Sequence, residues 1–265
     1  MKKFWFILTA LVATCFLVAC SGSQGVSPKT IKEKKKIVVA TESEFAPFEF
    51  KSLVNGKDTL VGADIELAKA IGEKLGVKVE FSVMSFDNVL ANVQSGKADI
   101  AIAGISVTDE RKKVYDFSDS YYTSENVVIV KKDKVNDYTS TDSLAKQTVG
   151  TQKGSVQETV AKKQISKASV VSLSSNGEMI NELKSGQLQA VVLEKAIAEG
   201  YIAQNDDLTL ANFNLKSDGT DAYAVATRKG SDDLLKEINA VIKETKDSGK
   251  FDQWLKEAST YKQSK

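Results

Sequence analysis

Eight residues that follow an apolar run carry the side chains best suited to bind an anion. The run Ile100–Ala103 has the composition of a buried strand, and Gly104-Ile105-Ser106-Val107-Thr108-Asp109-Glu110-Arg111 comes directly after it. Backbone N–H groups converge where a strand ends and a helix begins, and the helix dipole adds partial positive charge there. The guanidinium of Arg111 adds a planar fork of donors that fits a carboxylate. The segment therefore predicts a corner that binds a small carboxylate.

The composition excludes several other kinds of site. The 265-residue chain contains no histidine, which rules out a Ser-His-Asp triad, histidine general-base catalysis and the usual zinc sites. Its formal net charge is +1, so the overall charge does not favour a nucleic-acid partner. These absences weaken the case for catalysis, so we predict no metal, no cofactor and not an enzyme.

The N-terminus has the pattern of a bacterial lipoprotein signal peptide. Two lysines precede the apolar stretch Phe4–Val18, which is too short to span a bilayer comfortably. Small residues then lead to Cys20, as in a lipobox, and a Ser/Gly-rich stretch follows. We expect residues 1–19 to be cleaved, Cys20 to carry lipid, and residues 20–36 to form a flexible tether. An uncleaved membrane anchor with an incidental cysteine is the alternative. In either case the predicted folded part has no cysteine and no disulfide.

From residue 37 onward, short apolar strands alternate with amphipathic helices. Hydrophobic positions three and four residues apart predict the helices, and glycine or Ser-Gly pairs mark their ends. The strands are apolar on both faces, as in parallel sheets covered by helices. Asn55-Gly56 predicts a hairpin turn. The predicted strands are 37–41, 77–81, 99–103, 127–130, 148–151, 170–171, 190–193 and 222–226, and the predicted helices are 63–75, 86–94, 154–163, 176–184, 196–203 and 234–249.

An internal similarity divides the chain into two lobes. Val93–Ala101 resembles Leu183–Val191, since each has the pattern of a helix end, a Ser-Gly stop and a buried strand. Ligands of such sheets bind at the carboxyl ends of the strands. The Thr41–Phe45 loop, the Thr151–Val156 loop and Leu193-Glu194 fall at those ends. We therefore expect them to meet the anion-binding corner.

Four motifs recur together in one known family. They are Ala46-Pro47-Phe48-Glu49-Phe50, Val61-Gly62-Ala63-Asp64-Ile65-Glu66-Leu67-Ala68, the Gly104–Arg111 segment and Asp116-Phe117-Ser118. With these motifs the chain resembles, over about residues 37–257, the polar amino-acid substrate-binding proteins of bacterial ABC importers. The resemblance implies an α/β fold of the type II periplasmic-binding-protein kind, with two lobes joined by crossover strands at 124–127 and 220–223. Lobe one would comprise 37–123 plus 224–265, and lobe two 127–219.

The same resemblance implies a function and roles for particular residues. The protein would be an extracytoplasmic monomer, held at the cell membrane by lipid on Cys20. It would close its lobes around one free amino acid and deliver it to an ABC permease with its ATPase. Relatives often have threonine near Val156, so only a backbone role carries over there. The implied roles are a bidentate pair with the ligand α-carboxylate for Arg111, hydroxyl and backbone groups from Ser106 and the Gly104 region, N–H groups from Gly154 and Val156, a pair with the α-ammonium for Glu194, and aromatic walls from Phe45 and Phe86.

Glu42 is the predicted specificity residue. The resemblance places here an acid that reaches the far end of a basic or amide ligand side chain, and nearby Glu44 suggests an acidic end wall. Arginine or lysine is therefore favoured, with glutamine or histidine as alternatives. Glu42 as a solvated loop charge and Phe86 as a core residue are the structural alternatives. An enzyme or a sensor on the same fold is the other class of function; an enzyme would need a poised carboxylate such as Glu42 or Glu194.

Overall fold

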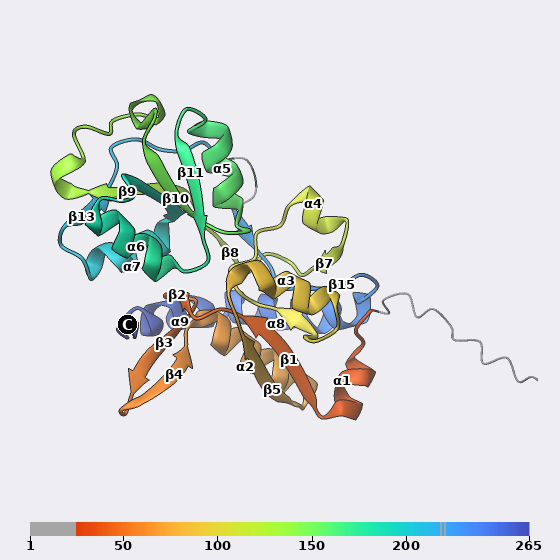
Figure 1. Cartoon of the computed structure of the whole chain (residues 1–265). Coiled ribbons are helices and arrows are strands. Elements are labelled where there is room, and N and C mark those ends of the chain that lie inside the picture. Colours follow the sequence, from red (N-terminus) through yellow and green to blue (C-terminus); the bar gives the residue numbers. More distant parts are fainter. Residues whose placement is uncertain (1–24, 218, 220, 265) are drawn as a thin grey trace, which may run out of the picture.

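The computed structural model describes residues 25–217, 219 and 221–264, which form two lobes that meet along a seam (Figure 1). The predicted signal peptide, the predicted lipidation site Cys20 and the start of the predicted tether lie outside the described residues. Within the described part of the chain, no helix combines the length and hydropathy needed to cross a membrane.

Lobe one is built on a five-stranded sheet with the order β5-β1-β6-β15-β7. β1 pairs in parallel with β5 and β6, whereas β15 runs antiparallel to β6 and β7. α2 packs against α8 and α9. The strands are β1 (Lys36–Thr41), β5 (Lys78–Val83), β6 (Ile100–Ala101), β7 (Tyr115–Phe117) and β15 (Ala226–Arg228), and the helices are α1 (Pro28–Lys34), α2 (Ala63–Leu75), α3 (Phe86–Gln94), α4 (Asp109–Lys112), α8 (Asp232–Asp247) and α9 (Lys250–Ala258).

Lobe two repeats this plan with the order β11-β10-β12-β9-β13. β10 pairs in parallel with β11 and β12, and β9 runs antiparallel to β12 and β13. The strands are β9 (Asn126–Lys131), β10 (Thr148–Gln152), β11 (Ser169–Leu173), β12 (Ala190–Glu194) and β13 (Leu208–Leu210), the helices are α5 (Val156–Gln164), α6 (Asn176–Ser185) and α7 (Lys195–Ala203), and 3₁₀ turns cover Lys132–Lys134 and Thr141–Leu144.

One strand in each sheet departs from the predicted parallel arrangement. The chain crosses between the lobes at β8 (Tyr122–Thr123) and β14 (Ala222–Tyr223), which pair antiparallel with each other. β9 follows β8, and β15 follows β14. β9 and β15 therefore begin at the side of their sheets that faces the other lobe, where the parallel strands end. From there they must run antiparallel to those strands. For the same reason the strand predicted over 222–226 is split into β14 and β15.

The hydrophobic pattern located the helices that cover the sheets. α2 has the predicted bounds: Ile65, Ala68 and Ile71 are buried on one side, and Gly76 adopts a φ of 69° where the helix ends. A small separate sheet contains β2 (Glu44–Phe45), β3 (Glu49–Val54) and β4 (Lys57–Val61), with the predicted turn at Asn55-Gly56 between β3 and β4.

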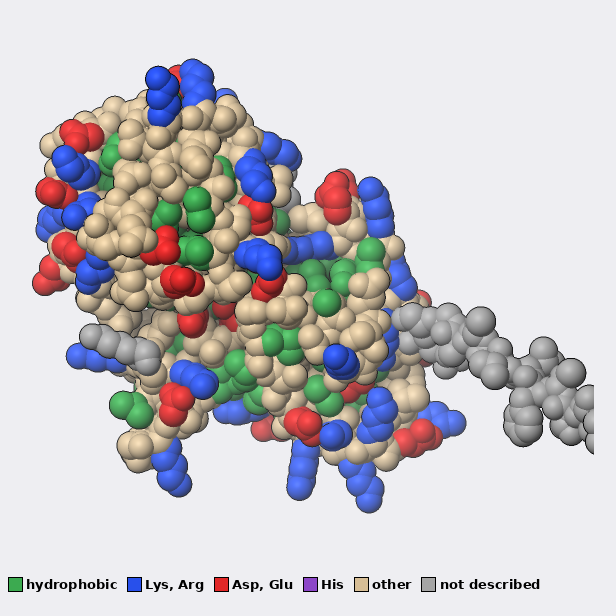
Figure 2. All heavy atoms as spheres, viewed as in Figure 1, with side chains coloured by type: hydrophobic (Ala, Val, Ile, Leu, Met, Phe, Trp, Pro, Cys, Tyr) green, Lys and Arg blue, Asp and Glu red, His purple; other side chains and the backbone are tan. Residues whose placement is uncertain are grey.

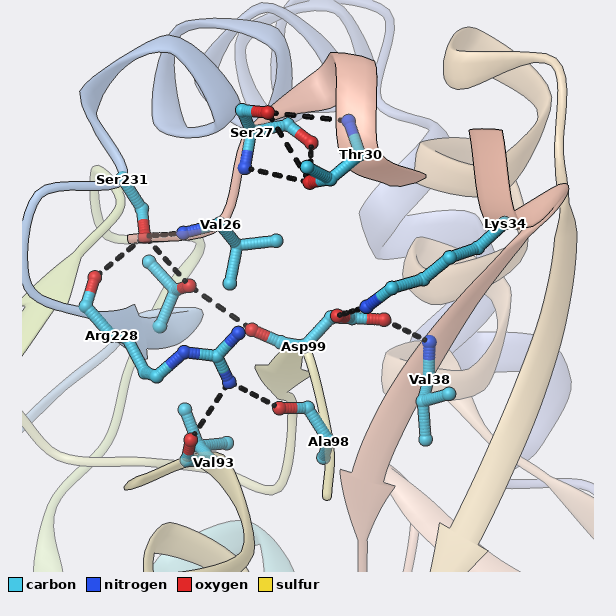
Figure 3. A network of polar contacts seen from close by, with 11 residues as sticks. Val26, Ser27, Thr30, Lys34, Val38, Val93, Ala98, Asp99, Arg228 and Ser231 are labelled. Carbon is cyan, nitrogen blue, oxygen red and sulfur yellow. Dashed lines mark hydrogen bonds and ion pairs between the residues drawn. The ribbon is translucent and has the colours of Figure 1, made fainter. Parts of the chain in front are cut away.

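The predicted flexible tether is wrong from Val26 onward. Val26 is buried, and its N–H donates a hydrogen bond to Ser231 Oγ at 2.8 Å (Figure 3). Ser27 caps the N-terminus of α1, and Ile31 within this helix is wholly buried. Lys34 Nζ lies 3.5 Å from Asp99 Oδ1. The lysine-rich composition concealed two apolar residues, which are buried in the core of lobe one and contribute to docking the segment.

The segment that receives α1 is itself held by a polar network. Arg228 donates from Nη1 to the carbonyl oxygens of Val93 and Ala98, both at 3.0 Å (Figure 3). Asp99 Oδ2 accepts the N–H of Val38 at 2.9 Å. Together with the ion pair between Lys34 and Asp99, these bonds join α1, β1, α3 and β15, so α1 is an integral part of lobe one.

Candidate ligand-binding site

Arg111 lies at the seam, and its guanidinium contacts both lobes. Nη1 donates to the carbonyl oxygen of Ser106 at 2.7 Å, and Nη2 donates to the carbonyl oxygen of Gly154 in lobe two at 3.1 Å. Its Cζ lies 5.8 Å from the centre of the Phe86 ring. Burial lowers the pKa of Arg111 to about 10, and the negative charge of Glu194 partly offsets this effect. Arg111 therefore stays charged at neutral pH.

The backbone part of the predicted anion-binding corner differs from the structure. The N–H of Gly104 donates to Asp64 Oδ2 at 3.1 Å, so it is already engaged by a buried carboxyl. α4 is a single turn, and the N–H of Arg111 is capped by Thr108 Oγ1 at 3.1 Å. At this corner the Arg111 side chain, rather than a free backbone N–H or a helix dipole, is therefore the group suited to an anion. Gly104 has a different role: its φ is 54°, and a Cβ there would lie 2.6 Å from the Phe45 ring.

Glu194 places an acidic side chain at the end of β12, in lobe two. Its side chain is buried, and burial raises the pKa of Glu194 to about 7 despite hydrogen bonding and the charge of Arg111. Arg111 and Glu194 lie in opposite lobes, and the charge of each shifts the pKa of the other. The seam therefore carries a basic and an acidic group suited to the two ends of a zwitterion.

Glu42 lies just after β1 and is 3% exposed. Gln152, at the end of β10 in lobe two, donates from Nε2 to both carboxylate oxygens, at 3.2 and 3.1 Å. Burial raises the pKa of Glu42 to about 8, and the charges of Glu44 and Glu194 raise it further, while Gln152 opposes them. The side chain is therefore not a solvated loop charge.

The other predicted residues are buried or already hydrogen-bonded, and some of them differ from the predicted roles. Phe86 and Val156 are the first residues of α3 and α5, and both are buried. Phe45 packs on Phe48 and Gly104, which places at least part of its ring in the core. The N–H of Gly154 donates to Glu158 Oε2 at 3.0 Å, so the contribution visible at the seam is its carbonyl oxygen.

The sequence prediction missed Gln152 and placed Glu44 only in an acidic end wall with Glu42. Gln152 is the last residue of β10 and lies within the predicted Thr151–Val156 loop. Its place at the carboxyl end of a strand was the only feature of the sequence that could have indicated a role at the site. Glu44 does not form an end wall with Glu42. Its carboxylate accepts hydrogen bonds from Ser175 Oγ at 2.7 Å and from the N–H of Gly177 at 3.0 Å, both in lobe two. We define Arg111, Glu194, Glu42 and Gln152 as the interlobe site.

Comparison with known proteins places this geometry in context. Residues 37–258 match the family model of the bacterial extracellular solute-binding proteins, family 3. The arginine-binding extracellular protein ArtP of Bacillus subtilis (strain 168) is 34% identical over 261 residues, covering 97% of this chain and 97% of that protein. The glutamine-binding protein GlnH of an ABC transporter from the same organism is 32% identical over 277 residues, covering 97% and 98% of the two chains.

A solved structure is similar over nearly all of the described chain. It is the amino-acid ABC transporter substrate-binding protein AbpA of Streptococcus pneumoniae Canada MDR_19A, bound to L-arginine. The two chains are 50% identical with a TM-score of 0.86, and the match covers 89% of this chain and 100% of that one.

Proposed function

The chain belongs to the bacterial extracellular solute-binding proteins of family 3, and from this premise we propose that it captures L-arginine for an amino-acid ABC importer. It is an amino-acid ABC transporter substrate-binding protein. The choice of arginine among the amino acids is the proposal. It is supported first by the charges of the interlobe site and second by the arginine-binding relatives.

The single observation that carries the proposal is a third buried ionisable group, Glu42, beyond the two that a zwitterion needs. Arg111 and Glu194 complement an α-carboxylate and an α-ammonium. Glu42 then remains, buried and with a raised pKa, as a carboxyl that favours a cationic side chain. A guanidinium fits best because its planar fork can donate to both carboxylate oxygens, whereas the ammonium of lysine is a point charge.

A neutral glutamine side chain is the main competitor, since one relative is named for glutamine. Beside a neutral glutamine side chain Glu42 would stay protonated, because burying an unpaired charge is unfavourable, and the charge-assisted hydrogen bonds open to a guanidinium would not form. Isothermal titration with L-arginine, L-lysine, L-glutamine and L-histidine tests this proposal. We expect arginine to bind most tightly and lysine next. Glutamine or histidine binding as tightly as arginine would contradict it.

The family places the protein outside the cytoplasm. We propose that Cys20 carries the lipid that holds it at the membrane and that residues 1–19 are removed. Metabolic labelling with a radioactive fatty acid should mark the wild-type protein but not Cys20→Ser. We also propose that the protein is a monomer that delivers its ligand to an ABC permease. Labelled-arginine uptake in a strain lacking this chain, with and without restoration, tests delivery.

The relatives that match are transport binding proteins, which favours binding without turnover. We propose that the protein is not an enzyme. Prolonged incubation with L-arginine, followed by NMR of the recovered solute, should return unchanged arginine. A product that disappears in Glu42→Gln or Glu194→Gln would instead favour an enzyme on this fold.

A further inference from the structure

We propose that Glu44 is a positioning residue that holds the two lobes together from outside the interlobe site, and thereby sets how long the ligand is retained. The inference rests on the proposed function only in using L-arginine as the probe. Its geometry is independent of which amino acid binds.

Three hydrogen bonds from lobe two converge on this one residue of lobe one. Ser175 Oγ and the N–H of Gly177 donate to Oε2 of Glu44, at 2.7 and 3.0 Å. Tyr201 Oη, on α7, donates to the backbone carbonyl oxygen of Glu44 at 3.2 Å. Glu44 is in turn fixed to lobe one, because β2 pairs it with Phe50 of β3. The contact therefore exists only when the lobes are together.

The N-terminus of α6 is well suited to receive this carboxylate. Ser175 is the N-cap, and its hydroxyl accepts the N–H of Glu178 at 3.1 Å while donating to Glu44. First-turn N–H groups lack intrahelical acceptors, and the dipole of a ten-residue helix favours negative charge at this end. From the opposite lobe, Glu44 thus provides an acceptor for the Gly177 N–H and a negative charge at the positive end of the helix dipole.

Glu44 is separate from the groups that would contact the ligand. Two residues earlier, Glu42 is buried and bonded to Gln152, whereas Glu44 lines a groove of about 930 Å³ beside α6 and α7 that also includes Ser175 and Tyr201. Figure 2 shows acidic side chains along the seam where the two lobes meet. Glu44 makes no hydrogen bond to those groups, but its charge raises the pKa of Glu42. Removing that charge would favour ionised Glu42 and tighter arginine binding, so faster dissociation in a Glu44 variant would report on lobe closure.

Another polar contact between the lobes, also outside the interlobe site, is weaker. Lys153 Nζ of lobe two lies 2.9 Å from Asp87 Oδ2 of lobe one, but the lysine side chain is 57% exposed. Solvent screens such a pair, and its two flexible side chains lose entropy when they meet. Glu44 instead bonds to a backbone N–H and to a hydroxyl at a fixed helix end, so its removal should have the larger effect on closure.

Loss of the Glu44 contact should shift the lobes toward the open state and shorten ligand residence. Apparent affinity scales with the fraction of binding-competent protein, and differences between variants of one site fall mostly on the dissociation rate. We expect Glu44→Gln to dissociate L-arginine roughly tenfold faster, the scale of one charge-assisted hydrogen bond.

Glu178→Gln is the matched control. Like Glu44→Gln, it removes one negative charge near the N-terminus of α6. Glu178, however, is exposed and belongs to lobe two, so it does not join the lobes. Stopped-flow dissociation should show little change for this variant. Equal acceleration in Glu178→Gln and Glu44→Gln, or no acceleration in Glu44→Gln, would overturn the proposal.

A charge-repulsion test separates positioning from a general structural role. Ser175→Asp keeps a good N-cap for α6 but places a second carboxylate against Glu44. It should accelerate dissociation strongly on its own and much less in combination with Glu44→Gln. Effects of the two substitutions that simply multiply would contradict direct contact between these positions.

A measurement without ligand tests the role of Glu44 separately from the proposal that the protein binds arginine. Spin labels attached through Lys97→Cys in lobe one and Lys134→Cys in lobe two report the distance between the lobes. Glu44→Gln should increase the population of long distances in the absence of any amino acid, and Glu178→Gln should not. If the wild-type protein fails to bind arginine, the proposed function is wrong while this comparison still decides the role of Glu44. Identical distance distributions for wild type and Glu44→Gln would overturn the role of Glu44 alone.

Discussion

Glu42 of lobe one and Gln152 of lobe two meet across the seam, with Gln152 Nε2 at 3.2 and 3.1 Å from the two carboxylate oxygens. The pair brings a buried acid and an amide to one point from residues 110 positions apart in the sequence. It can accept a cationic group at the carboxylate, while the amide fixes the orientation of that carboxylate.

Glu42→Gln should weaken L-arginine binding by about 2–4 kcal/mol, because the ligand guanidinium would lose its charged partner in a buried place. Binding of L-glutamine should be affected much less. Isothermal titration of both ligands measures the difference. Glu33→Gln, at an exposed position on α1, is the control. A parallel loss for arginine and glutamine would show that Glu42 does not discriminate between side chains.

Arg111→Ala should abolish detectable amino-acid binding while leaving the fold intact. A buried α-carboxylate without its cation costs about 2–5 kcal/mol. Arg111 stands at the seam rather than within a lobe core, so the thermal unfolding midpoint should change little. Lys112→Ala, one residue further on the exposed side of α4, should bind normally. Unchanged affinity in Arg111→Ala would remove this residue from the site.

Binding of L-arginine should release protons near neutral pH. The pKa of Glu42 is about 8, so the carboxyl is mostly protonated at pH 7, and a guanidinium beside it favours the ionised form. Affinity should therefore rise by up to about tenfold per pH unit below that pKa and level off above it. Calorimetry in buffers of different ionisation enthalpy counts the protons. A buffer-independent enthalpy in the wild type, equal to that of Glu42→Gln, would contradict the prediction.

The same carboxyl should make folding stability depend on pH. Glu42 loses its proton near 4.5 in the unfolded chain and near 8 in the folded protein, so the folded state binds more protons between these values. The free energy of unfolding should then fall as pH rises from about 4.5 to about 8. Urea unfolding at several pH values should show a smaller fall for Glu42→Gln. Parallel curves for the two proteins would show that Glu42 is not the origin.

Ile31→Ala should undock α1 from lobe one. Removing a wholly buried isoleucine side chain costs about 2–5 kcal/mol when the surroundings cannot collapse. Hydrogen exchange should lose protection over Pro28–Lys34 while lobe two keeps its own. Lys32→Ala, on the exposed side of the same helix, should leave protection unchanged. Full protection of α1 in Ile31→Ala would show that the polar contacts alone dock it.

Local patterns predicted most elements because their signals lie close together in the chain. α2 and α3 have the predicted bounds, since their apolar stripes end at Gly76 and at Ser95-Gly96. Contacts between distant residues were not available in the same way. The N–H of Gly104 is directed to Asp64, 40 residues earlier, and no local signal indicates this.

The two acids of the Thr41–Phe45 loop show a similar limit. Glu42 and Glu44 are chemically identical and nearly adjacent. Their different partners, Gln152 and Ser175, depend on where lobe two lies rather than on the loop itself. The tether was wrong for another reason: Val26 and Ile31 are too few to form a periodic signal, yet their burial decides the position of α1.

The docking of α1 determines how a mechanical load on the N-terminal segment would be distributed. A pull on Val26 passes through Ser231 and Ile31 into the framework of lobe one, and β8 and β14 are not in its path. Lobe one would act as the stationary body and lobe two as the part that swings. Tension on the N-terminal segment would then leave the balance between open and closed lobes undisturbed, so attachment and ligand capture could proceed independently.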